Sequence, residues 1–268
     1  MTDHIKRFLP VAILLLVVLG FVVWYMMQVP APSPFATTQE PATQVSEPTK
    51  VAEEAPYYTV DAIYPTQTTL ATSAGTQADQ VAVATMKAFV DGEIAQFKKD
   101  GNFPHLSAED IQMLGLGERK YAIGIEYKTY QSASTLSYVY QIYVDTGGAH
   151  PNTYYHTFTF DKKSGVELSL SDVFVTNAPY LQTLSDTSRA TLPGMIAKME
   201  SVTTAEVDIE YIKSGTKPEK EAFQNFYFDG NRLVIIFPPY QVGPYVLGMI
   251  TLPIPTENLK DLKPEYNT

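Results

Sequence analysis

Cysteine is absent from this 268-residue chain. A disulfide framework, a thiol nucleophile, a cysteine-ligated zinc ion and an iron–sulfur cluster are therefore excluded. Histidine is scarce, with four residues in the chain, and none of the motifs HExxH, GxSxG, P-loop or Rossmann glycine pattern occurs. We accordingly expect no catalytic residues, no resident metal and no cofactor.

Positive charge is also in short supply. The chain has 19 lysines and arginines against 29 acidic residues, which gives a formal net charge of −10. A surface of this sign disfavours nucleic acid and anionic lipid as partners. It either speeds encounter with basic proteins or serves only solubility, and composition leaves both interpretations open.

One long apolar run is present near the amino terminus. The uncharged segment 8–27 is 20 residues long, which spans about 30 Å as a helix, the thickness of a bilayer core. Lys6 and Arg7 precede it, and the next basic residue is Lys50. The positive-inside rule then predicts a single-pass protein of the cell membrane, with a cytoplasmic tail (1–7), a transmembrane helix (8–28) and an extracytoplasmic remainder.

A cleaved signal peptide is the alternative interpretation of this segment. The apolar run is longer than a usual signal-peptide core, and Pro32 follows the small-residue site 29–31, so we expect an uncleaved anchor. Residues 29–56 contain six prolines and few bulky apolar residues. That composition predicts a disordered or polyproline-like linker.

From residue 57 onward the pattern is that of an α+β domain. Segments 121–128, 136–144 and 154–160 alternate apolar and polar residues, which predicts an antiparallel meander. A helix is expected before them, over 77–99. It places one set of apolar residues on one face: Ala82, Met86, Val90, Ile94 and Phe97.

The second half repeats the mixture of helix and strand. A helix starts near Pro179, and Pro193-Gly194 is expected to break or kink it. A hairpin over 226–237 and a strand over 247–254 follow. We therefore expect an α+β fold class with antiparallel sheets and packed helices in two consecutive subdomains, 57–165 and 166–268.

Two segments of the domain resemble a known family. The first is TGGAHPN (146–152), followed by Phe160-Asp161 and LSLSDVF (168–174), and the second is PYQVGPY (239–245). In order and separation they resemble the RsiV-type extracytoplasmic domain, a domain of unknown function also found before the catalytic domain of PdaC-type peptidoglycan deacetylases. The resemblance implies a PdaC-like subdomain over 57–165 and an RsiV-like one over 166–268.

The resemblance also implies a place in the cell envelope and a binding task, since RsiV itself is similar in its outer part and recognises lysozyme. We expect no anti-sigma activity, because residues 1–7 are too few to hold a sigma factor. We expect no deacetylase activity, because no Asp and His metal site of that enzyme follows the two segments.

The same two segments supply the candidate ligand-binding residues: Gly147, Gly148, His150, Asn152, Tyr240, Gly243 and Tyr245. The glycine loop either offers backbone N–H groups to an anion or a sugar, or only forms a tight turn. The tyrosines beside prolines either present rings to a sugar or a partner loop, or only pack a rigid turn. A zinc site from Asp145, His150 and His156 is conceivable, but the aromatic neighbours of His156 favour a core histidine.

These observations lead to a functional expectation with two alternatives. We expect a membrane-anchored, non-catalytic binding domain of the bacterial envelope whose partner is a lysozyme-like wall-active protein or peptidoglycan. The first alternative is an envelope hydrolase or deacetylase-related enzyme that uses His150. The second is a structural partner of another membrane protein through segment 8–27.

Overall fold

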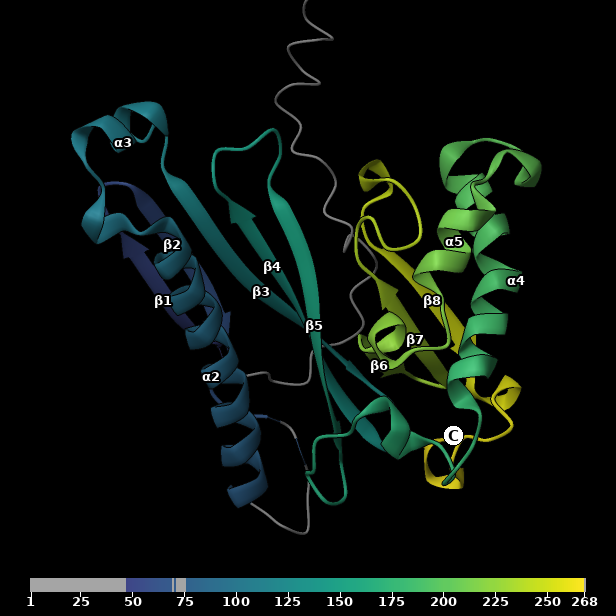
Figure 1. The fold of residues 1–268 in the computed structure, drawn as a ribbon. Coiled ribbons are helices and arrows are strands. Elements are labelled where there is room, and N and C mark those ends of the chain that lie inside the picture. The colour runs from purple at the N-terminus through teal and green to yellow at the C-terminus, as the bar shows by residue number, and fades with distance from the viewer. Residues whose placement is uncertain (1–46, 69, 71–75, 268) are drawn as a thin grey trace, which may run out of the picture. The chain divides into compact units, whose positions relative to one another are not determined.

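In the computed structural model the described residues are 47–68, 70 and 76–267 (Figure 1). They fall within one compact unit, Gln44–Thr268. The expected cytoplasmic tail 1–7, the transmembrane helix 8–28 and the linker up to residue 46 lie outside the described residues. Among those that are described, no helix has the length and apolar character needed to span a membrane.

The first sheet has five strands in the order β1-β2-β3-β4-β5. Their bounds are β1 Thr49–Glu54, β2 Tyr58–Tyr64, β3 Tyr121–Gln131, β4 Thr135–Asp145 and β5 Asn152–Asp161. The predicted meander is confirmed, because β3, β4 and β5 pair antiparallel. The expectation of purely antiparallel sheets is wrong, since β2 and β3 are parallel. The connection between these two strands contains a long helix. The helix brings the chain back to the end of the sheet at which β2 begins, and parallel neighbouring strands require a crossover of this kind.

Strand β1 corrects the expected linker range. The linker was expected to reach residue 56, yet Thr49–Glu54 pairs antiparallel with β2 in the register Val51↔Ala62. Four of its six residues are exposed and only Thr49 and Val51 are half-buried. An edge strand of this kind has no apolar alternation, so its composition resembles that of a polar spacer.

Helix α2 (Thr76–Gly101) covers one face of the five-stranded sheet. Its five predicted core residues are all buried, with exposures of 8% or less. They join a cluster that includes Val60, Ile123 and Phe158 from the strands. At roughly 1.5–3 kcal/mol for each large apolar side chain, burial of this face stabilises the first half.

The second half has its own three-stranded antiparallel sheet and its own core. The strands are β6 Phe226–Asp229, β7 Arg232–Phe237 and β8 Ile250–Pro255, and the helices are α4 Tyr180–Glu200 and α5 Ile209–Gly215. The helices lie along this sheet in Figure 1, and their apolar residues share one cluster with the strands. A short helix, α3 (Ala108–Met113), belongs to the first half.

The sequence predicts a break or a kink at Pro193, and helix α4 passes through this residue without ending, so the break is wrong. Proline removes one backbone donor and costs about 3 kcal/mol inside a helix. Leu192 and Ile196, on either side of Pro193, are 0% and 2% exposed. Their burial against the second core offsets the cost of the proline and keeps the helix continuous.

The two cores meet across a polar contact. Thr157 and Thr159 alternate with Phe158 and Phe160 along β5, so their hydroxyls point away from α2. The Thr157 hydroxyl accepts the N–H of Phe226 at 3.1 Å, and the Thr159 hydroxyl donates to the Phe226 carbonyl at 3.2 Å. Short 3₁₀ turns complete the chain: Phe103–His105, Leu170–Val173, Thr204–Glu206, Lys220–Phe223, Tyr245–Leu247, Thr256–Asn258 and Pro264–Tyr266.

Candidate functional site: an aromatic cluster on two loops

The loop between β4 and β5 carries three of the seven candidate residues, and a fourth, Asn152, begins β5. Asp145, at the end of β4, accepts the N–H of Gly147 at 2.9 Å and forms an ion pair with Arg119. Gly147 has φ +79°, and a Cβ placed on it would lie 3.2 Å from the Tyr121 ring. Gly148 has no such restriction, since its Cβ would meet only the His150 carbonyl oxygen, at 3.9 Å. The glycines thus shape a tight turn, and only Gly147 is required for it.

The segment after β7 is held by contacts with α5. The Gln241 side-chain N–H groups donate to the carbonyls of Gly215 and Ala222, both at 2.8 Å. Gly215 leaves no room for a side chain, because a Cβ there would lie 1.7 Å from the Gln241 carbonyl oxygen. A Cβ on Gly243 would approach Leu247 to 2.7 Å. These contacts fix the turn from which Tyr240, at φ +69°, projects into solvent with 53% exposure.

His150, Tyr240 and Tyr245 come together although 90 or more residues separate the histidine from the tyrosines. The His150 and Tyr245 rings stack with centroids 4.2 Å apart and an interplanar angle of 22°. Tyr240 lies beside both, with centroids 6.3 Å from His150 and 5.4 Å from Tyr245. We call these three residues the aromatic cluster.

Hydrogen bonds fix the orientation of the rings. The Pro151 carbonyl accepts two of them, from the Tyr245 hydroxyl at 2.9 Å and from His150 Nδ1 at 3.0 Å. A carbonyl only accepts, so Nδ1 carries a proton, and in the neutral imidazole Nε2 is an acceptor. The Tyr240 hydroxyl lies 3.2 Å from Nε2 and donates to it in that tautomer. Two phenols and an imidazole therefore form one connected group.

The other four candidate residues stand outside the aromatic cluster. Gly147, Gly148 and Gly243 belong to the two turns, and Asn152 is exposed at the start of β5. Asn152 instead lines a separate cavity beside α2. The structure thus brings together the three aromatic candidates and gives the glycines a supporting role.

The conceivable zinc site of Asp145, His150 and His156 does not form. Asp145 is engaged with Arg119, and His150 with Tyr240 and Tyr245. His156 stacks on Phe89 with centroids 4.5 Å apart, and burial lowers its pKa. Among the residues that the structure describes, no three His, Cys, Asp or Glu side chains are placed to hold a metal. His156 is half-buried and packs on Phe89 and Phe158, so the aromatic neighbours expected from the sequence do contact it.

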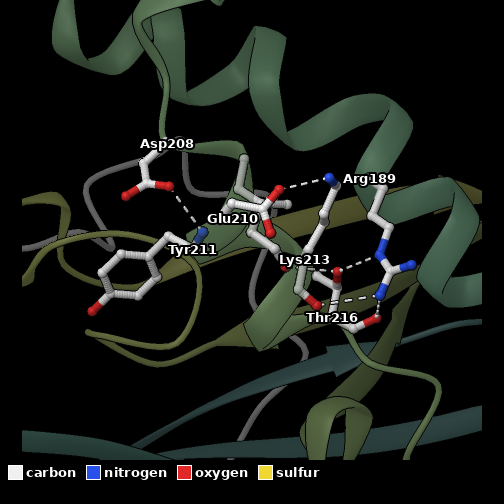
Figure 2. A network of polar contacts seen from close by, with 7 residues as sticks. Arg189, Asp208, Glu210, Tyr211, Lys213 and Thr216 are labelled. Atoms are coloured by element: carbon white, nitrogen blue, oxygen red, sulfur yellow. Dashed lines mark hydrogen bonds and ion pairs between the residues drawn. The ribbon is translucent and has the colours of Figure 1, made fainter.

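A further set of contacts positions α5, and Figure 2 shows those between Arg189, Lys213 and Thr216. The Gln241 side chain is bonded to the last residue of this helix. Arg189, on α4, donates from Nε to the Thr216 hydroxyl and from its terminal nitrogen to the Lys213 carbonyl, both at 3.2 Å. The Ser185 hydroxyl donates to the Thr216 carbonyl at 2.6 Å. The end of α5 is thereby attached to α4 directly beside Gly215. Sequence reasoning missed Arg189, Gly215 and Gln241, of which only Gln241 lies in a quoted motif.

Comparisons with known proteins relate the chain to a family of unknown function and to a cell-wall enzyme. Residues 171–257 match the model of the family described as a protein of unknown function, DUF3298. The chain is 29% identical over 187 residues to the peptidoglycan-N-acetylmuramic acid deacetylase PdaC of Bacillus subtilis. That match covers 68% of this chain and 36% of PdaC, so the chain spans about a third of the length of this curated relative.

Two solved structures share the fold. One is a member of the DUF3298 family from Bacteroides fragilis, with a TM-score of 0.56, 21% identity, and coverage of 81% of this chain and 92% of that one. The other is a DUF3298 family protein from Pseudomonas aeruginosa, with a TM-score of 0.50, 14% identity, and coverage of 82% and 95%. The α+β fold with two sheets is therefore that of DUF3298 structures. The chain is related to DUF3298 and to PdaC, while the RsiV-type part of the resemblance stays a prediction.

Proposed function

We propose that the folded unit is a non-catalytic binding domain of the bacterial cell envelope, held at the cell membrane through segment 8–27. Its ligand is a basic, lysozyme-like wall-active protein or peptidoglycan itself. The observation that carries the proposal is the aromatic cluster. His150, Tyr240 and Tyr245 come from two loops and are fixed by hydrogen bonds, and His150 and Tyr240 are exposed.

The chemistry of the cluster supports binding. Tyrosine rings provide apolar area with a polar tip, and such residues dominate interface energies. The rings are already held in place, so little side-chain entropy is lost when a ligand binds. The net charge of −10 favours a basic protein partner.

The hydrogen bonds of the imidazole favour binding over hydrolysis. Both ring nitrogens of His150 are occupied, one by the Pro151 carbonyl and one by the Tyr240 phenol. A general base needs a free nitrogen within reach of the proton it removes. The relation to PdaC, which by its name acts on peptidoglycan, supports the cell wall as the place of action.

Binding of the full chain to lysozyme and to purified peptidoglycan sacculi, each at low and high salt, tests this proposal. Tyr240→Ala and His150→Ala remove one ring each and should weaken binding of the true ligand by about 10-fold or more, the range of interface hot spots. Met113→Ala, a 74% exposed apolar residue on α3, serves as the matched control and should leave affinity unchanged.

The comparison of low and high salt distinguishes a protein ligand from a glycan ligand. An affinity for lysozyme that falls as salt rises supports a charge-steered protein partner, whereas salt-insensitive binding to sacculi supports the glycan. If the chain bound neither, or if the two ring deletions bound as well as the Met113 control, the proposed role of the aromatic cluster would be wrong.

A further inference from the structure

A separate cavity of about 480 Å³ lies between α2 and the strands β3, β4 and β5. Its volume falls within the roughly 300–1,000 Å³ of small-molecule sites. Its polar lining consists of Glu93, Gln96, Asp100, Thr146 and Asn152, and its apolar and aromatic walls include Phe97, Tyr121, Ile123, Val144 and Tyr154. Thr146 belongs to the loop that carries His150, and Asn152 follows that loop directly as the first residue of β5, so the cavity and the aromatic cluster are connected through one loop.

The charges in the cavity are not compensated by its lining. Glu93 and Asp100 are both acidic, and no Lys, Arg or His is among the residues that line it. Neutral donors hold the two carboxylates: the Tyr154 hydroxyl bonds one oxygen of Glu93, and Gln96 Nε2 bonds Asp100 Oδ1 at 2.6 Å. Among the described residues, no hydrogen bond to the other oxygen of either carboxylate is found. A cation beside either carboxylate would compensate its charge.

The shape of the lining favours an organic cation over a metal ion. Glu93 and Asp100 are seven residues apart on α2, about 10 Å along the helix axis, which is too far for one ion. Tyr121 and Tyr154 bring phenol rings to the same space. Burial raises the pKa of Tyr154, which keeps its phenol a hydrogen-bond donor. Rings that stack on a flat apolar face, with amides and hydroxyls beside them, suit a sugar.

We propose that this cavity binds an amino sugar with a free, protonated amine, as in a wall glycan whose nitrogens carry no acetyl group. Glu93 and Asp100 receive the ammonium groups, the tyrosine rings receive the sugar faces, and Gln96 and Asn152 bond the hydroxyls. The inference rests on the proposed function in the form in which the ligand is peptidoglycan, because peptidoglycan would be the source of this sugar. It adds a second site, distinct from the aromatic cluster.

Calorimetric titration of the full chain at about pH 6 tests the inference. The three probes have four units each: the β-1,4 tetramer of glucosamine, the same tetramer of N-acetylglucosamine, and tetralysine. The variants are Glu93→Gln and Asp100→Asn, which keep the shape and the acceptor of each bond. Asp91→Asn, an exposed carboxylate on the same helix paired with Lys87, is the matched control. Thermal unfolding of each variant shows that its fold is intact.

The glucosamine tetramer should bind at least about 10-fold more tightly than the acetylated one. Either cavity variant should remove about 10-fold of that affinity, the value of one charge-assisted hydrogen bond, and the control should remove none. Equal binding of both sugars, or equal binding of the variants and the control, would overturn the inference. Tetralysine binding as tightly as the glucosamine tetramer, with the same dependence on Glu93, would overturn the sugar and assign the cavity to a basic polypeptide.

Binding of the unaltered chain to sacculi and lysozyme is measured in parallel. If sacculi or lysozyme bind through Tyr240 while the glucosamine tetramer does not bind, the cavity inference fails and the proposed function stands. If Glu93→Gln weakens binding of the glucosamine tetramer while Tyr240→Ala changes binding of neither sacculi nor lysozyme, the proposed role of the aromatic cluster fails and the cavity inference stands.

Discussion

Gln241 should be the side chain on which the presentation of Tyr240 depends most. Its amide donates to the carbonyls of Gly215 and Ala222, and all three residues are half-buried. Replacing it with alanine leaves both carbonyls without their donor. At about 0.5–1.5 kcal/mol for each bond, Gln241→Ala should cost about 2 kcal/mol of unfolding free energy, or roughly 4–8 °C of melting temperature.

Gln241→Glu gives a sharper version of the same test. The carboxylate has no N–H to donate and places a negative charge against two carbonyl oxygens, so at neutral pH this variant should be less stable than Gln241→Ala. Gln182→Ala is the matched control, because Gln182 bonds Asp186 on an exposed helix face at 2.8 Å. A change within about 0.5 kcal/mol is expected for the control.

The assay is thermal and urea unfolding followed by far-ultraviolet circular dichroism, together with the affinity for lysozyme and sacculi. Both Gln241 variants should lose affinity as well as stability, since Tyr240 is attached to the same turn. The reasoning would be refuted by Gln241→Ala costing no more than the Gln182 control, or by Gln241→Glu being the more stable of the two.

Two further predictions concern His156 and Gly147. Burial lowers the pKa of His156 below the ordinary 6.5, so its neutral form stabilises the fold fully above pH 6.5, and this contribution is lost as the pH falls through 6.5 toward the lower folded value. The melting temperature of His156→Phe should therefore fall less between about pH 7 and pH 5 than that of the unaltered chain. His105→Phe, at an exposed site, is the control and should fall as the unaltered chain does. An equal dependence of melting temperature on pH in both variants would contradict the burial argument. Gly147→Ala, strained at φ +79° and close to Tyr121, should lower the urea-unfolding free energy by about 1–2 kcal/mol. Gly148→Ala should be nearly neutral, and comparable losses would show that the turn does not depend on Gly147 alone.

The elements with a strong period could be predicted from the sequence. The buried face of α2 follows from apolar residues at helical spacing, and β3, β4 and β5 follow from alternation. Alternation alone does not predict whether neighbouring strands are parallel or antiparallel, because that depends on the end of the sheet to which the connecting segment returns the chain. The long helix between β2 and β3 already implied a parallel pair. The continuity of α4 through Pro193 depends on the packing of Leu192 and Ile196, which local propensity does not contain.

The site could be predicted only in part. The motifs indicated His150, Tyr240 and Tyr245, but contact across 90 residues is a property of the tertiary structure. Glu93 and Asp100 fall at polar positions of an amphipathic helix, where a sequence indicates only a solvent face. Glu93 and Asp100 line a cavity because a loop and strands from later in the chain pack beside them.

The charged edge strand β1 has a consequence for how the protein keeps apart from its own copies. Lys50, Glu53 and Glu54 pair with Asp61, Lys98 and Lys120. Exposed pairs of this kind contribute only about 0–1 kcal/mol each. Their larger effect is on association, because a strand from another molecule that extended this sheet would have to strip water from three charged side chains. The outer edge of the first sheet is therefore a poor template for aggregation, even at the high local concentration that attachment to a surface would bring.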